Sequence, residues 1–177
     1  GPTQTFISAH LYWSGPSGPV AGDGDFDVQL NGNNVTAQRT FALTANTGLH
    51  YFAAYANVTA IVGAIGNGTY TLSELDLTGV IGPYCGGGTD FGGWAIYVIY
   101  EDPALTLNQI SLFDGLEYVS ASNTTLEIIL TNIDIATDDL AKIGFLAWEG
   151  DAALAVNETL LINGILIDNP PLNPGDN

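Results

Sequence analysis

The sequence predicts an all-β protein: a β-sandwich of two sheets, of jelly-roll or Ig-like type, with one short helix and an extended Pro-rich C-terminal tail. Apolar and polar residues alternate in short runs, and glycine, asparagine and aspartate residues separate these runs at the spacing typical of sandwich strands. The 177 residues are 46% hydrophobic and 12% charged, so the chain can bury a core and is not a disordered polymer. We expect one sandwich domain over residues 1–167 and a tail over residues 168–177.

The first strands are predicted by alternation and by one turn. The range Thr5–Trp13 has an apolar residue at every second position, which is typical of a strand with one face in a core. The run Phe26–Leu30 is followed by Asn31-Gly32, the strongest short signal for a β-hairpin. We therefore expect a return strand to begin at Val35.

One segment has the period of a helix instead of a strand. Apolar residues of the range Asn57–Gly66 recur three and four positions apart, so we expect a short helix with Asn57 as its cap and Gly66 at its end. The range Asp168–Asn177 has three prolines and few apolar residues. It should be an extended linker, and we expect further chain to follow it.

Four later runs are predicted to supply the central strands of the sandwich. They are Trp94–Glu101, Gln109–Phe113, Thr125–Ile133 and Lys142–Glu149. The first is apolar on both faces up to Tyr100, so we expect it to be buried, and we place Trp13, Trp94 and Trp148 in the core. A second tight hairpin is predicted where Asn163-Gly164 joins Leu160–Ile162 to Ile165–Ile167.

The charge of the chain excludes two classes of partner. It has 19 acidic residues against two basic ones, Arg39 and Lys142, for a net charge of −17. Such a chain cannot neutralise a run of phosphates and is repelled by an anionic lipid surface. No apolar run approaches the roughly 18 residues of a spanning helix, so we expect no nucleic acid partner and no membrane insertion.

Five Asn-X-Thr sequences match the acceptor pattern for N-glycosylation, where chance predicts about 1.9 from the asparagine, serine and threonine content. The candidate acceptors are Asn34, Asn57, Asn67, Asn123 and Asn157. Asn57 is the poorest of them, because its side chain is also the proposed helix cap. The alternative interpretation is that asparagine and threonine are simply common in turns and strands.

One acidic loop contains a set of hard oxygen ligands. Asp23, Asp25 and Asp27 alternate in a glycine-containing segment, which makes Ca²⁺ the one candidate cofactor. The twelve-residue EF-hand pattern is not met, since no glutamate stands at its last position. A solvated loop without metal is the competing interpretation.

We expect no enzymatic activity. Glu101 and Glu149 are the one carboxylate pair that we consider for sugar hydrolysis, and nothing in the sequence places them together. His10, His50 and Cys85 lack the local context of an activated nucleophile. Aromatic residues able to stack on sugar rings, as in a lectin, are Tyr12, Trp13, Tyr51, Phe52, Tyr55, Tyr84 and Tyr97, although alternate aromatics in strands are usually core.

Five segments carry a resemblance to a known family: Phe91–Pro103, Ile110–Gly115 and Lys142–Asp151, and also Asn57–Tyr70 and Asn157–Pro174. Together they resemble a β-rich domain of large secreted and cell-surface proteins of bacteria, of the gliding and adhesin type, with relatives among archaeal surface proteins. The resemblance covers most of the chain. It implies an extracellular or cell-surface location and a structural role, and it brings no catalytic motif.

The function that we expect is that of a structural subunit of an extracellular filament or surface fibre, with other copies of itself as partners. Natural sheets protect their edges with lysine, and this chain has one lysine in all. A terminal segment of one subunit can therefore add a strand to its neighbour, a heterologous contact that propagates. The N-terminal strand is the favoured donor, before the tail after Asp168, with the contact residues Thr5, Phe6, Ile7, Ala9, Leu11 and Trp13. The alternative is an adhesive, lectin-like and calcium-dependent module that binds glycans or a host or abiotic surface.

Overall fold

The structure is a computed structural model that describes residues 3–106, 108–133, 142–148 and 159–167. The chain divides into two compact units, residues 1–142 and 143–177. Each unit is described by itself.

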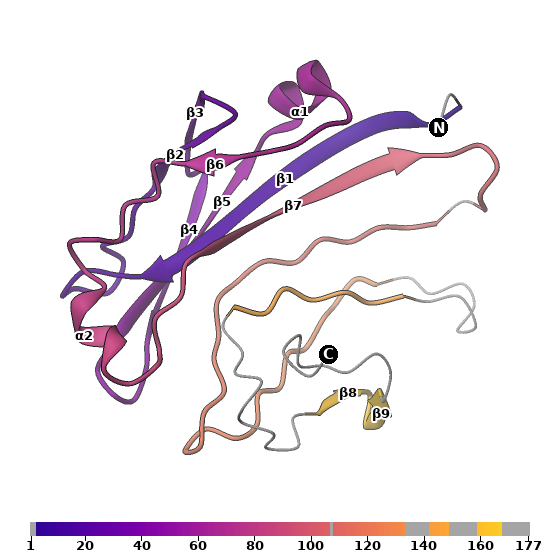
Figure 1. The fold of residues 1–177 in the computed structure, drawn as a ribbon. Helices are drawn as coiled ribbons and strands as arrows, with labels where there is room; N and C mark the ends of the chain where they lie inside the picture. The colour runs from indigo at the N-terminus through magenta and orange to yellow at the C-terminus, as the bar shows by residue number, and fades with distance from the viewer. Residues whose placement is uncertain (1–2, 107, 134–141, 149–158, 168–177) are drawn as a thin grey trace. The chain divides into compact units, whose positions relative to one another are not determined.

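The larger unit is built on a four-stranded antiparallel sheet of order β4-β5-β1-β7 (Figure 1). Its members are β1 (Thr5–Pro16), β4 (Arg39–Thr44), β5 (His50–Asn57) and β7 (Gly93–Glu101). The predicted first strand is confirmed, and it extends three residues beyond its predicted end. It pairs with β5 on one side and with β7 on the other, so the first strand of the chain occupies the middle of the sheet.

A second antiparallel sheet has the order β3-β2-β6. It contains β2 (Asp27–Leu30), β3 (Asn33–Thr36) and the short β6 (Leu72–Ser73). The predicted hairpin is confirmed: Asn31 and Gly32 have φ values of 48° and 75°, as the two central residues of a type I′ turn require.

Two short helices complete this unit. The first, α1, spans Thr59–Ile65 and ends at Gly66, whose φ is 71°. The predicted helix and its terminal glycine are confirmed, but Asn57 lies one residue before the N-cap position, where its Oδ1 accepts a hydrogen bond from Thr59 N at 3.0 Å. The second, α2 (Gly82–Cys85), is a single turn that the sequence did not predict.

The core lies between the two sheets. On the large sheet, Ala9, Leu11 and Trp13 of β1 and Phe52 of β5 are fully buried, and they pack with Val28, Leu30 and Val35 of the second sheet and with Val62 of α1. Each large apolar side chain buried in this way contributes about 1.5–3 kcal/mol to folding. Two antiparallel sheets with few helices confirm the all-β class; the jelly-roll or Ig-like type stays a prediction.

The run Trp94–Tyr100 was predicted to be a buried strand, and the prediction of burial was wrong. The run forms β7, but β7 is an edge strand that pairs with β1 on one side. Trp94, Val98 and Tyr100 are 37%, 47% and 51% exposed. They lie on the core face of the large sheet, since Trp94 and Val98 stand opposite the buried Trp13 and Ala9, but the second sheet is too narrow to cover them all. Trp13 is in the core as predicted, and Trp148 is half-buried.

Three of the predicted central strands are not strands in the structure. The ranges 109–113, 125–133 and 142–148 are without assigned secondary structure, and residue 149 lies outside the described residues. Within the described part of the chain, the segment 108–133 makes backbone hydrogen bonds to other backbone groups at Ser120 and Asn123. Alternation selects an extended backbone, but a strand also needs a neighbour with which to pair.

The second unit contains the late hairpin. Strands β8 (Leu160–Ile162) and β9 (Ile165–Ile167) pair around Asn163 and Gly164, which have φ values of 50° and 78°, so this prediction is confirmed. The predicted tail over residues 168–177 lies outside the described residues, and its boundary with the domain stays a prediction.

Candidate functional site

The first candidate site is the position of β1 between its two neighbours. Residues 10–16 of β1 pair with β5, and residues 5–14 pair with β7 around a bulge between Phe6 and Ser8. The six predicted contact residues therefore fall into two groups. Ala9, Leu11 and Trp13 are buried in the core of their own subunit, whereas Thr5, Phe6 and Ile7 are exposed where β1 pairs with β7 alone.

The connection from β1 to β2 is a compact turn. Ser17 N donates to His50 O at 2.9 Å, and Gly18 N donates to Asp23 O at 3.0 Å. Gly24 lies so close to the core that a Cβ there would stand 2.3 Å from Cγ of Phe52, so no larger residue fits in this arrangement. In the described conformation the turn returns the chain directly to the second sheet of the same subunit.

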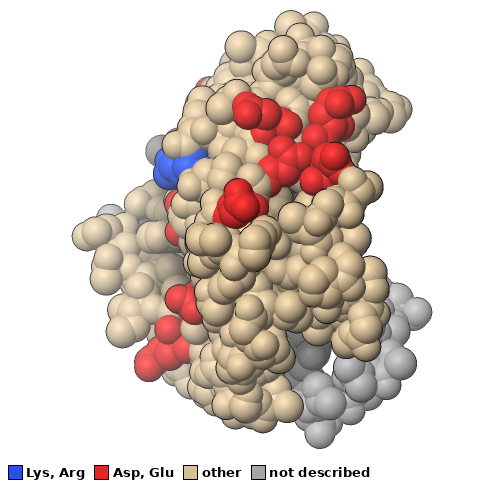
Figure 2. All heavy atoms as spheres, turned by 90° about the vertical axis from the view of Figure 1, so that its left-hand side faces the viewer, with Lys and Arg blue, Asp and Glu red and all other residues tan. Residues whose placement is uncertain are grey.

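The three aspartates of this turn do not converge on one point. Asp25 Oδ2 accepts a hydrogen bond from Asp76 N at 2.7 Å, and Asp27 Oδ1 accepts one from Thr36 Oγ1 at 2.6 Å. Among the described residues, no three His, Cys, Asp or Glu side chains are grouped as metal ligands would be. Figure 2 shows acidic side chains gathered on one face of the molecule; the calcium site at Asp23, Asp25 and Asp27 stays a prediction.

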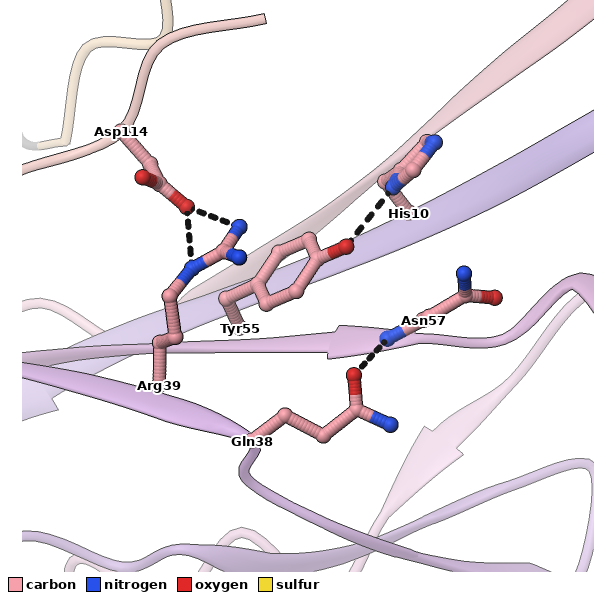
Figure 3. Close-up of polar contacts among 6 residues, drawn as sticks. All are labelled: His10, Gln38, Arg39, Tyr55, Asn57 and Asp114. Atoms are coloured by element: carbon pink, nitrogen blue, oxygen red, sulfur yellow. Dashed lines mark hydrogen bonds and ion pairs between the residues drawn. The ribbon is translucent and has the colours of Figure 1, made fainter.

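A polar clamp lies on the face of the large sheet that is turned away from the core (Figure 3). The clamp consists of Arg39 on β4, Tyr55 on β5, His10 on β1, and Asp114. The guanidinium carbon of Arg39 lies 3.8 Å from the ring centroid of Tyr55, and both Nε and Nη2 of Arg39 donate to Asp114 Oδ2. Tyr55 Oη is in turn hydrogen-bonded to His10 Nδ1 at 2.9 Å. Desolvation lowers the pKa of Arg39, but the hydrogen bond and charge of Asp114 raise it to a net value above the ordinary one.

The clamp fixes a segment that pairs with no strand of the described part of the chain. Asp114 belongs to the segment 108–133. This segment is also held by Asn46, whose backbone N donates a hydrogen bond to Tyr118 Oη at 3.0 Å and whose Nδ2 donates to Ser122 Oγ. One of only two basic residues in the chain is thus used to attach this segment to the sheet. The sequence did not predict the clamp, because the register that places Arg39 opposite Tyr55 is a property of the folded sheet. The one available signal was that a chain with so few basic residues has an arginine at this position.

Tyr12 occupies the centre of the same face. Its ring lies 5.2 Å from that of Tyr55 and 5.8 Å from that of Tyr97, measured between centroids. Its hydroxyl is buried and has no hydrogen-bond partner among the described residues. Burial is the main cause that raises the pKa of Tyr12 to about 12; the negative charge of Asp114 adds to this effect, and the neighbouring Arg39 guanidinium, which lies near the hydroxyl without meeting the geometry of a hydrogen bond, offsets part of it.

Most of the aromatic residues considered for sugar stacking are not on the surface. Five of them are buried and two, Tyr51 and Tyr97, are half-buried. The buried five are Tyr12, Trp13, Phe52, Tyr55 and Tyr84. Their packing with one another and with the core is the usual role of aromatics in strands.

The catalytic candidates are dispersed over the described residues. Glu101 is exposed at the end of β7, and Glu149 lies outside the described residues. His10 is bonded to Ser8 and Tyr55, and the other histidine, His50, pairs its Nδ1 with Thr44 Oγ1 at 2.8 Å. Cys85 is exposed, and its Sγ donates to Ile81 O at 3.4 Å.

Four of the five glycosylation candidates lie in the described part of the chain. Asn34, Asn57 and Asn67 are exposed, and Asn123 is half-buried. Asn157 lies outside the described residues. Their side chains differ in hydrogen bonding: those of Asn34, Asn57 and Asn123 are hydrogen-bonded to other described residues.

Comparison of the chain with protein-family models, with curated proteins and with solved structures found no match. The resemblance to bacterial and archaeal surface domains therefore stays a prediction. Among the described residues, no helix is long and apolar enough to cross a bilayer.

Proposed function

We propose that the chain is a structural subunit of an extracellular filament or surface fibre, whose neighbouring copies are joined by exchange of the N-terminal strand. The observation that carries the proposal is the place of β1, which is first in the sequence and lies between β5 and β7. The β1 strand of a neighbour that entered this position would make the same contacts. Exchange of an identical element is a low-cost route to assembly.

The exchanged strand carries no charged side chain, which favours its insertion into a strongly acidic neighbour. Residues 5–16 contain no Asp, Glu, Lys or Arg in a chain with a net charge of −17. The strand can therefore enter a neighbour without burying a charge. Ala9, Leu11 and Trp13 supply the apolar burial, and both edges of the strand supply main-chain hydrogen bonds, as in strand addition to a sheet.

The exchange gives an open assembly because donor and acceptor are different surfaces. Each subunit donates β1 and accepts another β1 between β5 and β7, so the contact is heterologous and propagates unless a ring closes. The turn between β1 and β2 is the hinge that must open. Opening it breaks the hydrogen bonds from Ser17 N to His50 O and from Gly18 N to Asp23 O, which the same turn can form again only after exchange is complete or reversed.

Exposed apolar residues on the described strands give a second reason to expect assembly. Phe6, Val98 and Tyr100 are each more than a third exposed and are neighbours on β1 and β7, since Phe6 pairs with Tyr100 and Val98 lies two residues before Tyr100 on the same strand. Contiguous apolar surface on a single chain marks an interaction site. We place the assembly outside the cell, as the resemblance to surface proteins implies.

A disulfide trap tests the exchange. In a Cys85→Ser background, Thr5→Cys is combined with Glu101→Cys, because these positions are paired between β1 and β7. Oxidation of the assembled material should give an intermolecular ladder on a non-reducing gel, since the paired residues then belong to different subunits. The matched control is Thr44→Cys with His50→Cys, a pair within the β4–β5 hairpin, which should close within one chain.

Two outcomes would contradict the proposal. One is an intramolecular Thr5–Glu101 disulfide in material that electron microscopy shows to be polymeric, since β1 then stays in its own subunit. The other is the presence of isolated particles alone at all concentrations and salt conditions tested.

A further inference from the structure

We propose that Asn67 is the preferred attachment site for an N-linked glycan on the described part of the chain, and that its first sugar covers an apolar groove beside it. Asn67 stands between Gly66 and Gly68 in the loop after α1, and all three are exposed. The side chain of Asn67 makes no hydrogen bond to another described residue. A loop flanked by glycines can adopt the conformation that a glycosyltransferase requires.

The other described acceptors are restrained. Asn34 lies within β3, where its Oδ1 accepts a hydrogen bond from Gln29 Nε2 at 3.1 Å. Asn57 Oδ1 accepts from Thr59 N at 3.0 Å, and its backbone N donates to Gln38 Oε1 at 3.0 Å. Asn123 Nδ2, the atom that would receive the sugar, donates to Tyr118 O at 3.0 Å.

The threonine of the acceptor pattern is a second difference between Asn57 and Asn67. Thr59 Oγ1 accepts a hydrogen bond from Ala9 N at 3.0 Å and donates one to Ala9 O at 3.5 Å, so it is held against β1. Thr69 is exposed, and its hydroxyl makes no hydrogen bond to another described residue. Both side chains that define the pattern are therefore available at Asn67.

The attachment reaction is balanced with a lipid-linked sugar diphosphate as the donor. A bond forms between Asn67 Nδ2 and C1 of the sugar, and the bond between C1 and the phosphate oxygen breaks. The lipid diphosphate leaves, and Nδ2 loses one proton. A transferase of the producing cell performs this step on the exposed amide.

The groove beside Asn67 gives the sugar a place to lie. It has a volume of about 260 Å³ and is lined by Phe6, Val62, Gly63, Tyr70 and Val98, with Asn67 on its wall. Tyr70 Oη donates to Gly66 O at 2.5 Å, which holds the ring in place. Gly63 lets Phe6 approach α1, since a Cβ there would stand 3.2 Å from Phe6 Cε1. Uncharged, partly aromatic walls suit the apolar C–H face of a pyranose ring.

The proposal does not depend on assembly. Asn67 lies on the loop after α1, outside the pairing of β1 with β5 and β7, so its modification can be measured on single chains. Phe6 and Val98 line the groove and also belong to the exposed apolar surface of β1 and β7, so a sugar that fills the groove covers these two side chains and withdraws them from contact with a neighbouring subunit. Attachment at Asn67 itself is measured whether or not filaments form.

Site occupancy is the first test. The full chain is secreted from a eukaryotic host that has an N-glycosylation transferase, and occupancy is measured at each acceptor by peptide mass spectrometry. Occupancy at Asn67 should exceed that at Asn34, Asn57 and Asn123 several-fold. Asn67→Gln should remove most of the glycan from these four sites, and the matched variant Asn34→Gln should leave it. Equal or higher occupancy at any of the other three, or no occupancy at Asn67, would overturn the proposal.

Thermal unfolding tests the groove. Trimming the glycan at Asn67 to one sugar allows comparison with Asn67→Gln, and the single sugar should raise the midpoint by about 2–4 °C, the shift that accompanies about 1 kcal/mol in a chain of this size. Val98→Thr makes the groove polar with little change of shape and should abolish most of this rise. No rise, or a rise that Val98→Thr leaves unchanged, would overturn the placement of the sugar in the groove.

Discussion

Single residues on the outer face of the large sheet affect the stability of the fold, because several of them bury a polar group. Tyr12 is the clearest case, since its hydroxyl is buried without a hydrogen-bond partner among the described residues. A buried unsatisfied group costs about 1–3 kcal/mol. We therefore expect Tyr12→Phe to leave the free energy of unfolding at pH 7 unchanged or to raise it by about 1 kcal/mol, measured by urea denaturation.

The same residue predicts a dependence on alkaline pH. The pKa of Tyr12 is raised to about 12 in the folded chain, against about 10 for an unfolded tyrosine. Between these values the unfolded chain loses the proton and the folded chain keeps it, so the stability present below pH 10 falls by about 2–3 kcal/mol as the pH rises to 12. Tyr12→Phe should make this fall shallower, and Tyr100→Phe, an exposed tyrosine on β7, is the control for loss of a hydroxyl. An unchanged alkaline slope would contradict the assigned burial.

Arg39 is a residue whose effect should be local. An exposed cation–π contact contributes about 0.5–1 kcal/mol and an exposed ion pair about 0–1 kcal/mol, so Arg39→Ala should lower the free energy of unfolding by about 1–2 kcal/mol. Arg39→Lys should recover little of this, because an ammonium group lacks the planar fork and stacks poorly. The clearer readout is amide hydrogen exchange, which should become faster in the segment 108–122 that Asp114 anchors.

The control for the clamp is Lys142→Ala, which removes the only other basic side chain. It should leave the exchange of residues 108–122 unchanged. Equal effects from both substitutions would mean that net charge, and not the contact with Tyr55 and Asp114, holds the segment.

At the level of elements, the turns determine where strands begin and end. Gly32 has a φ of 75°, a conformation that costs a residue with a Cβ about 1–2 kcal/mol. Gly32→Ala should lower the free energy of unfolding by about 1 kcal/mol, even though nothing lies within 4 Å of the added Cβ. Gly79→Ala, also in open space, is the matched control and should have an effect of a few tenths of a kcal/mol. A similar loss at both positions would mean that the backbone conformation of the hairpin is not the cause.

The elements that the sequence predicted are those that depend on local interactions. The two Asn-Gly hairpins, the first strand and the helix ending at Gly66 each follow from a period or a turn within about ten residues. Pairing partners are not encoded locally, which is why the edge position of β7 was missed. The same reason explains why 109–113 and 125–133 were expected to be strands although the structure gives them no ladder.

The candidate sites also divide into features that local sequence predicts and features that depend on the folded arrangement. The five acceptor patterns could be listed from the sequence, but the bonds that restrain Asn57 and Asn123 appear only in the fold. The contact residues of β1 could be named from alternation, yet their division into a buried and an exposed group requires the register with β5 and β7. The clamp of Arg39, Tyr55, His10 and Asp114 joins three strands and a distant segment, and no local pattern predicts it.

At the level of the whole molecule, charge and assembly oppose each other. A subunit with a net charge of −17 repels its copies at a distance, whereas the strand that we propose to be exchanged is uncharged. Repulsion between exposed charges is screened by salt, because the Debye length falls from about 30 Å at 0.01 M to about 3 Å at 1 M. Burial of Ala9, Leu11 and Trp13 and main-chain hydrogen bonds are not weakened in this way.

This contrast leads to a prediction about salt. Polymer growth, followed by light scattering, should become faster as sodium chloride is raised from 0.01 to 1 M, and polymers once formed should persist in 1 M salt when viewed by negative-stain microscopy. Calcium at matched ionic strength separates screening from specific binding: equal rates indicate screening alone, and a faster rate that Asp25→Asn abolishes would support the predicted calcium loop. Dissociation of formed polymers by sodium chloride would mean that ionic contacts hold the subunits together, and strand exchange would then be rejected.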